Sequence, residues 1–189
     1  KAINELKPIL GLELTATPQI EDGAKTLRFK NIIYDYPLGA AMEDGFVKEP
    51  AVVTKKNFST AGMTDSAIER AKLEDGIRLH ELTKVDLNTY ARENGCKMVK
   101  PFVLVIARDT THAKELQDFI QSKEFFNGEY NGKVIQVDSS KSGEEKEENI
   151  ERLLKVEQSD EPTEIVIHVN MLKEGWDVTN LYTIIPLRA

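Results

Sequence analysis

The chain has 189 residues, a formal net charge of −7, 40% hydrophobic residues and 30% charged residues. These values are typical of a globular protein with one full domain or parts of two. The acidic total argues against a dedicated nucleic-acid-binding domain, which is usually basic, although a motor needs only a narrow strip of phosphate contacts. The longest uninterrupted apolar run, residues 102–107, is too short to cross a membrane, so we predict no membrane partner.

The cysteine and histidine content limits the possible chemistry. A single cysteine, Cys96, excludes a disulfide within the chain, and His80, His112 and His168 are scattered without the spacing of metal ligands. We therefore predict no metal site and expect a reducing, cytoplasmic setting. Neither end carries the pattern of a signal peptide, and we expect the chain to be an internal piece of a longer protein.

Two threonines follow the first predicted strand, residues 8–14. Pro18 disfavours helix at Thr17 and cannot extend a sheet ladder, so the strand is expected to stop and to present the hydroxyls of Thr15 and Thr17 at its end. Residues 26–36 partly alternate and predict a second strand. Residues 37–43 then predict a short helix that ends at the following Asp-Gly pair.

Residues 51–100 predict a helical connector or insertion. A capping box at residues 66–69 is expected to start it, and Gly95 to end it. Gly76 is expected to divide it into two helices, the second with an imperfect apolar stripe. Its lysines and arginines could reach DNA, as could those of any solvated helix, and we assign it no chemistry.

The second half of the chain reads as alternating strands and helices. Short β-branched runs at residues 102–107, 134–137, 164–169 and 181–185 predict buried strands of a parallel sheet. A helix with capping side chains at its start lies between the first two, and another lies between the second and third. This order predicts an α/β fold with right-handed crossovers. The apolar faces of the two helices are predicted from Ala113, Leu116, Phe119 and Ile120, and from Ile150, Leu153 and Leu154.

Polar residues follow three of these strands, at the edge where open α/β sheets bind ligands. Arg108 and Thr110 follow the first strand, and Ser139 follows the second. After the third, Gly175 allows a close backbone approach and Asp177 supplies a carboxylate, a pair that suits a sugar hydroxyl or a nucleotide. A polar turn with a solvated acid explains the same Gly-x-Asp pattern. The glutamates at residues 144–148 are expected to complement a helix dipole rather than to act as catalysts.

Three of these stretches carry a family resemblance. Leu172-Lys173-Glu174-Gly175-Trp176-Asp177-Val178 resembles motif V of superfamily 2 helicases, in the Glu-Gly-Trp-Asp form typical of the restriction (Res) subunit of type III restriction-modification enzymes. Thr15-Ala16-Thr17-Pro18 resembles motif III, and the strand at residues 102–107 with its loop resembles motif IV. An excision-repair helicase-like protein has a similar motif V, with Leu in place of Trp176.

The resemblance implies an architecture and a set of roles. Residues 1–50 would be the end of a first RecA-like domain, residues 51–100 a connector, and residues 101–189 a second RecA-like domain truncated before motif VI. Gly175 and Asp177 would approach the ATP ribose, and Thr15 and Thr17 would couple hydrolysis to domain closure. The DNA backbone would contact Arg108, Thr110 and Ser139.

The resemblance also implies ATP and Mg²⁺ as cofactors, and double-stranded DNA and a methyltransferase (Mod) subunit as partners. The phosphate loop and the magnesium ligands of such motors are absent from this chain, so we expect it not to hydrolyse ATP by itself. Two alternatives remain open. One is the motor of another superfamily 2 enzyme, of type I restriction or excision repair, and the other is a non-catalytic α/β binding module.

Overall fold

The computed structural model describes residue 5 and residues 7–15, 17–22, 25–137, 144–169 and 178–187. Two units can be distinguished, Lys1–Phe58 and Ser59–Ala189, each of which makes its contacts mainly within itself. The division falls after residue 58, whereas the sequence predicts boundaries at residues 50 and 100. It differs because the long helix of the predicted connector packs against the sheet of the second unit.

The first unit contains one small antiparallel hairpin. Strand β1 (Gln19–Asp22) pairs with β2 (Lys25–Arg28), with Gln19 opposite Arg28. The strand predicted at residues 8–14 does not form, and the one predicted at residues 26–36 ends at Arg28, so both predictions need correction. Residues 8–14 are exposed and meet no partner strand among the described residues, and a β-prone sequence forms a strand only where one pairs with it.

The short helix of the first unit forms as predicted. Helix α2 (Leu38–Glu43) follows Pro37, and the chain leaves it through Gly45, whose φ of 77° lies in the left-handed region. The backbone N–H of Gly45 donates to the carbonyl of Met42 at 3.0 Å, and that of Phe46 to the carbonyl of Ala41 at 2.9 Å. These bonds satisfy carbonyls that the end of a helix leaves unpaired.

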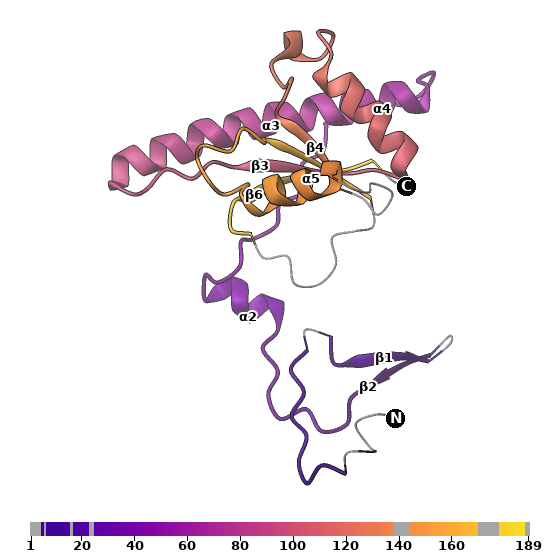
Figure 1. Cartoon of the computed structure of the whole chain (residues 1–189), viewed down its shortest axis with the longest axis vertical. Coiled ribbons are helices and arrows are strands. Elements are labelled where there is room, and N and C mark those ends of the chain that lie inside the picture. The colour runs from indigo at the N-terminus through magenta and orange to yellow at the C-terminus, as the bar shows by residue number, and fades with distance from the viewer. Residues whose placement is uncertain are drawn as a thin grey trace. The chain divides into compact units, whose positions relative to one another are not determined.

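The second unit is built on a four-stranded parallel sheet. Its strands are β3 (Phe102–Ile106), β4 (Val134–Val137), β5 (Ile165–His168) and β6 (Leu181–Pro186), in the spatial order β4-β5-β3-β6. All three pairings are parallel. The prediction of an α/β fold with a RecA-like parallel sheet and flanking helices is therefore confirmed (Figure 1).

Both faces of this sheet are covered. On one face, Val103, Val105, Ile165 and Ile167 pack with helices α3 (Asp65–Asn94) and α4 (Thr110–Gln121). On the other, Phe102, Leu104 and Val166 pack with helix α5 (Glu144–Leu154). Alternate residues of each strand thus enter opposite cores, because successive side chains of a strand point to opposite faces.

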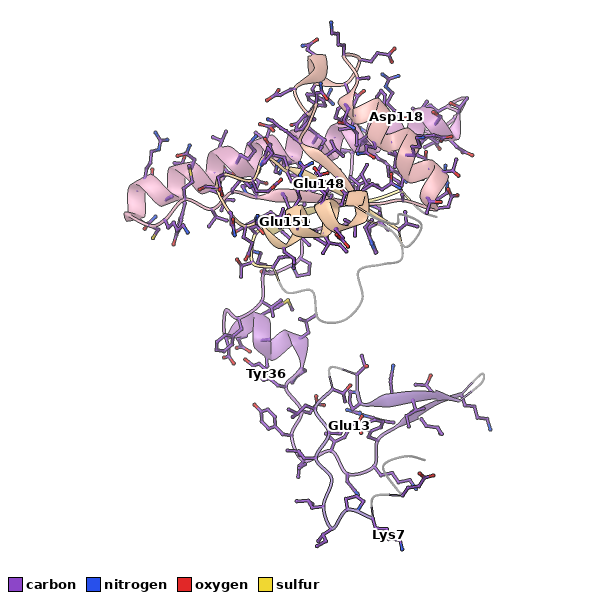
Figure 2. The ribbon with its side chains drawn as sticks, in the orientation of Figure 1. Lys7, Glu13, Tyr36, Asp118, Glu148 and Glu151 are labelled. Atoms are coloured by element: carbon purple, nitrogen blue, oxygen red, sulfur yellow. The ribbon has the colours of Figure 1, made fainter. Side chains whose placement is uncertain are left out.

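Two predictions about helices α4 and α5 can be compared with the packing. In α4, Ala113, Leu116 and Ile120 are buried as predicted, and Phe119 packs against the same core. In α5, Leu153 is buried but Leu154 is 72% exposed, so its assignment to the apolar face was wrong. The neighbouring Val156, just past the helix, fills the core instead. Glu148 and Glu151 of α5 and Asp118 of α4 lie exposed on the surface (Figure 2), which agrees with a solvated acidic face.

An aromatic group covers the end of α4. A short 3₁₀ turn, η1 (Phe126–Gly128), follows the helix. The Phe125 ring meets those of Phe119, Phe126 and Tyr130, with ring centroids 5.2, 4.8 and 5.9 Å away. Edge-on and tilted contacts of this kind add to the free energy gained by burial. This group anchors the connection between α4 and β4.

Helix α3 is continuous for 30 residues. Its N-cap is Thr64, whose hydroxyl accepts from the N–H of Ala67 at 3.2 Å, so the predicted start at residue 66 is corrected. Gly95 ends it as predicted, with a φ of 63°. Gly76 does not break the helix. A Cβ at residue 76 would lie 2.3 Å from Cδ1 of Ile185, so this glycine allows a close approach to β6. Among the described residues no helix has both the length and the apolar composition of a membrane span.

Candidate functional site at the carboxyl edge of the sheet

Three neighbouring strands end in register at one edge of the sheet. Val137 of β4 lies beside His168 of β5, which lies beside Ile106 of β3. The register continues past the strands, because the N–H of Ala107 donates to the carbonyl of His168 at 3.0 Å and that of Val169 to the carbonyl of Val137 at 3.2 Å. The three stretches predicted to bind ligands follow these three strand ends directly. The fold therefore starts all three at the carboxyl edge, the usual ligand-binding edge of such sheets.

Three of the predicted site residues lie outside the described residues: Ser139, Gly175 and Asp177. The described residues on either side of 170–177 lie at opposite edges of the sheet. Val169 continues from the carboxyl end of β5, whereas the carbonyl of Asn180 accepts from the N–H of Phe102 at the amino end of β3, at 3.1 Å. The roles assigned to Ser139, Gly175 and Asp177 stay predictions.

Arg108 and Thr110 lie where the sequence predicts, after β3 and at the start of α4. Asp109 caps this helix by accepting from the N–H of His112 at 2.9 Å, which confirms the predicted capping. Thr110 is half-buried as the first residue of α4. The side chain of Arg108 is 46% exposed, so its guanidinium can reach a ligand in solvent.

The carboxylate of Glu69, on α3, connects this helix to the carboxyl edge of the sheet. Its Oε1 pairs with the guanidinium of Arg108, and its Oε2 lies 3.3 Å from Nε2 of His112. The sequence analysis missed Glu69, because 39 residues separate it from Arg108 and no pattern connects the two. The only sequence signal is a charged residue near the start of a helix that later packs on the sheet.

His112 is nearly buried, with 5% of its side chain exposed. Its Nδ1 accepts from the backbone N–H of Arg108 at 3.2 Å, so in the neutral ring the proton must lie on Nε2, which faces Glu69. Burial, and next the nearby charge of Arg108, lower the pKa of His112 below its ordinary value. Nε2 lies close to the carboxylate of Glu69, but within the described part of the chain it makes no hydrogen bond to it.

Thr15 and Thr17 belong to the first unit and are exposed. Their hydrogen bonds are local: the N–H of Thr17 donates to Oγ1 of Thr15 at 3.2 Å, and that hydroxyl donates to the carbonyl of Thr17 at 3.3 Å. No strand precedes them at residues 7–14, so the predicted presentation at a strand end is corrected. Their coupling role stays a prediction.

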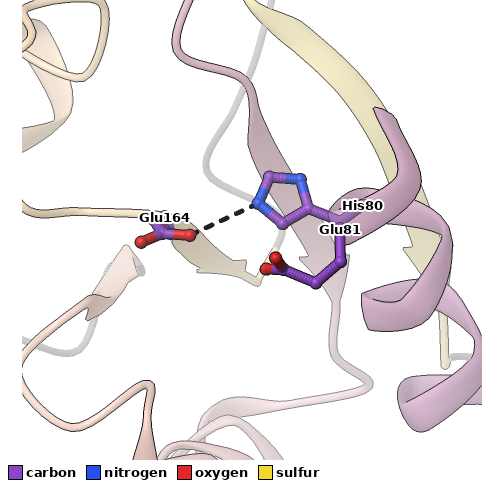
Figure 3. Close-up of side chains that lie close together, drawn as sticks. All are labelled: His80, Glu81 and Glu164. Carbon is purple, nitrogen blue, oxygen red and sulfur yellow. Dashed lines mark ion pairs between the residues drawn. The ribbon is translucent and has the colours of Figure 1, made fainter. Parts of the chain in front are cut away.

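A second polar cluster lies at the opposite, amino edge of the sheet. His80 and Glu81 of α3 approach Glu164, which precedes β5, and their ligand-type atoms all lie within 4.8 Å of one another (Figure 3). Nε2 of His80 lies 3.6 Å from Oε2 of Glu164, and within the described part of the chain neither ring nitrogen has a hydrogen-bond partner. Such donors are of the kind that hold zinc.

Two lysines compete with a metal in this cluster. Nζ of Lys84 lies 3.0 Å from Oε1 of Glu81 and 2.9 Å from Oε2 of Glu164, and Nζ of Lys133 lies 2.7 Å from the other oxygen of Glu164. Lys84 thus bridges the two carboxylates where a cation would sit, and the two lysines balance the two acids. We interpret the cluster as a structural ion network.

The charges in this network shift the pKa values of its members. Burial alone raises the pKa of Glu164, but the interactions with His80, Lys133 and Lys84 together outweigh it and hold the pKa well below its usual range. Burial, and then the hydrogen bond that its hydroxyl donates to Glu81 at 2.6 Å, raise the pKa of Tyr130 well above normal. Glu164 is therefore ionised, and Tyr130 stays protonated.

Comparison with models of protein families, with curated proteins and with solved structures gives no match to this chain.

Proposed function

We propose that the chain is part of an ATP-dependent DNA translocase motor of the kind found in the Res subunit of type III restriction enzymes. The observation that supports this best is the register of the three strand ends Val137, His168 and Ile106. The stretches assigned to DNA and to nucleotide each follow a predicted strand, and these strands end side by side. Every loop that follows a strand of a parallel sheet begins at this edge, so what the register adds is that these three strands are neighbours.

The charge distribution supports a narrow DNA contact rather than a wide one. With a net charge of −7, the whole surface does not attract DNA, and the binding free energy must come from a few placed cations. Arg108 is such a cation, since it lies at the carboxyl edge with its guanidinium partly exposed. Thr110 beside it offers a hydroxyl of the kind that commonly contacts a phosphate.

The nucleotide contact is assigned to Gly175 and Asp177, which would approach the ribose of ATP. ATP hydrolysis would supply the free energy for movement. The phosphate loop and the magnesium ligands would come from outside this chain, so its own residues would orient the nucleotide and grip the DNA. Closing and opening of two such domains would move the grip stepwise. The motor would act in the cytoplasm with a methyltransferase (Mod) subunit.

The test is ATP hydrolysis by the whole protein that contains this chain, with and without double-stranded DNA. We expect hydrolysis to rise when DNA is added. Asp177→Ala should reduce it strongly, because the ribose loses a hydrogen-bond acceptor, while the unfolding temperature stays unchanged. Asp160→Ala is the matched control, since Asp160 is an exposed acid away from the carboxyl edge and its loss should leave hydrolysis unchanged.

Two results would contradict the proposal, and a third would change the role of Asp177. No hydrolysis under any condition would favour a non-catalytic α/β binding module. Hydrolysis that DNA does not stimulate would indicate a nucleotide enzyme of another kind. A lower unfolding temperature of Asp177→Ala, with unchanged nucleotide affinity, would make Asp177 a structural residue.

A further inference from the structure

We propose that Glu69 is a positioning residue. Its carboxylate keeps the Arg108 guanidinium paired until a DNA phosphate replaces that carboxylate. The inference rests on the proposed function, because it names how one of the DNA contacts is controlled. It begins from the pairing of the Arg108 guanidinium with Oε1 of Glu69, which spans from α3 to the loop after β3. An arginine already paired with a carboxylate must exchange that partner before it can bind a phosphate.

The exposure of the two partners favours such an exchange. The side chain of Arg108 is 46% exposed, whereas that of Glu69 is 18% exposed. A phosphate can therefore approach the guanidinium from solvent while the carboxylate stays partly covered. Because the pair is partly solvated, its own contribution to stability is small, and a DNA phosphate, which carries the same single negative charge and lies among other phosphates, can compete with it.

His112 explains why the exchange does not leave Glu69 without a partner. Nε2 of His112, the nitrogen that carries the proton, lies 3.3 Å from Oε2 of Glu69, and among the described residues it has no hydrogen-bond partner. Once Arg108 has left, a small rotation of the carboxylate would let this N–H donate to it. The ring itself is held through Nδ1 by the backbone N–H of Arg108, so it does not follow the guanidinium. The start of α3 therefore remains attached to the carboxyl edge in both states.

The experiment measures binding of the 189-residue chain to a short double-stranded DNA over a range of salt concentrations. Glu69→Gln should lower the Kd about three- to five-fold, because a free Arg108 no longer has to leave a carboxylate. The slope of log K against log salt should stay unchanged, because Arg108 contacts the same phosphate in both proteins once DNA is bound, whereas Arg108→Gln should make it shallower by about 0.9.

Glu74→Gln is the matched control. Glu74 lies on the same helix, and its carboxylate pairs with Arg70 and Arg78 at 3.6 and 3.5 Å, so this variant makes the same charge change and removes one of the two carboxylates that each arginine pairs with. We expect it to change the Kd less than two-fold. An equal gain in both variants would overturn the inference, since a general loss of negative charge would then explain it.

Two more variants make the assignment specific. In an Arg108→Gln background, Glu69→Gln should give no gain, because the cation that it frees is missing. Glu69→Asp keeps the charge but shortens the side chain, so it should also tighten binding. A gain that persists without Arg108, or wild-type affinity in Glu69→Asp, would contradict the proposal. Unchanged unfolding midpoints would show that each variant is folded.

The outcomes separate this inference from the proposed function. Binding that Arg108→Gln weakens and Glu69→Gln leaves unchanged would overturn the inference alone. No binding by the wild type or by any variant would overturn both, because there would then be no DNA contact to control.

Discussion

The carboxylate of Glu164 connects three elements of the second unit. It precedes β5, and it binds Lys84 from α3 and Lys133 at the start of β4. Its backbone N–H also donates to the carbonyl of Lys133 at 2.9 Å. A carboxylate that is 13% exposed needs such partners, since a buried charge without them is costly. Its loss should therefore loosen the contact between helix and sheet.

The ionisation of Glu164 should make the stability of the protein depend on pH. The pKa of Glu164 is held well below its ordinary value of 4.5, so its contribution to stability is fully present above pH 4.5 and decreases as pH falls below that value. Glu164→Gln should lower the free energy of unfolding at neutral pH by about 2–3 kcal/mol, because it breaks charged hydrogen bonds. The variant should also lose less stability than the wild type on acidification. Urea unfolding, followed by circular dichroism at several pH values, measures both effects.

Other acids also lose stabilising charge at low pH, because Glu81 and Glu161 have lowered pKa values as well. The test is therefore the difference in the pH dependence of stability between the wild type and Glu164→Gln. Curves of stability against pH that run parallel for wild type and Glu164→Gln would show that this carboxylate does not carry the dependence. Glu151→Gln, at an exposed acid of α5, is a suitable control.

Single residues of the site were predictable only where local sequence places them. Arg108 and Thr110 follow a β-branched run, so their position at a strand end is visible in the sequence. Glu69 and Glu164 gain their roles from contacts with residues 39 and 80 positions away, Arg108 and Lys84 respectively. Such pairs depend on how α3 lies on the sheet, and no local pattern specifies that.

Among the elements, α3 stands out because it spans the sheet from edge to edge. Glu69 binds at the carboxyl edge, Leu73 and Ile77 lie in the core, and Lys84 binds at the amino edge. Gly76 lies between these two anchors, directly over Ile185 of β6. The glycine therefore sets how closely the helix approaches the sheet.

Gly76→Ala tests this close approach. Alanine favours a helix by about 1 kcal/mol over glycine, but its Cβ would collide with the buried side chain of Ile185. Overpacking costs about 1–3 kcal/mol, so we expect a net loss of about 1–2 kcal/mol in the free energy of unfolding. Adding Ile185→Val removes Cδ1 and should recover part of the loss. Additive effects of the two changes would show that they do not touch.

The success of element prediction follows the surroundings of each segment. The β-branched runs of β3, β4 and β5 lie buried between two layers of helix, and there apolar sequence and strand formation agree. Residues 8–14 are similarly apolar but exposed, and the sequence does not tell whether a partner strand exists. Gly76 led to the opposite error, since the sequence predicts a helix break there that does not form. Helix propensity is only a weak guide where packing decides.

At the scale of the whole molecule, the two units are joined by chain that carries no helix or strand. Residues 44–64 lie between α2 and α3, and residues 43–60 are all exposed. Backbone of this kind is open to proteases, whereas helix α3 is held by its contacts with the sheet. The joining segment contains Lys48, Lys55 and Lys56, and α3 carries the exposed Lys72.

Limited digestion with trypsin should therefore cut the joining segment first. We expect an early resistant fragment that begins after Lys48, Lys55 or Lys56, with Lys72 protected although its side chain is exposed. Mass spectrometry of the early products identifies the new amino terminus. Cleavage at Lys72 as fast as at Lys55 would mean that α3 is not held on the sheet.

The order of the strands also has a consequence for folding during synthesis on the ribosome. Of the four strands of the parallel sheet, β3 is synthesised first, yet both of its neighbours, β5 and β6, come later in the chain. Until residue 186 has emerged, the fully buried Phe102, Val103 and Val105 have at least one unpaired side beside them. Contacts between distant parts of a chain slow folding, and they leave intermediates with exposed apolar surface that are prone to aggregate. Nascent chains that stall before β6 should therefore need chaperones.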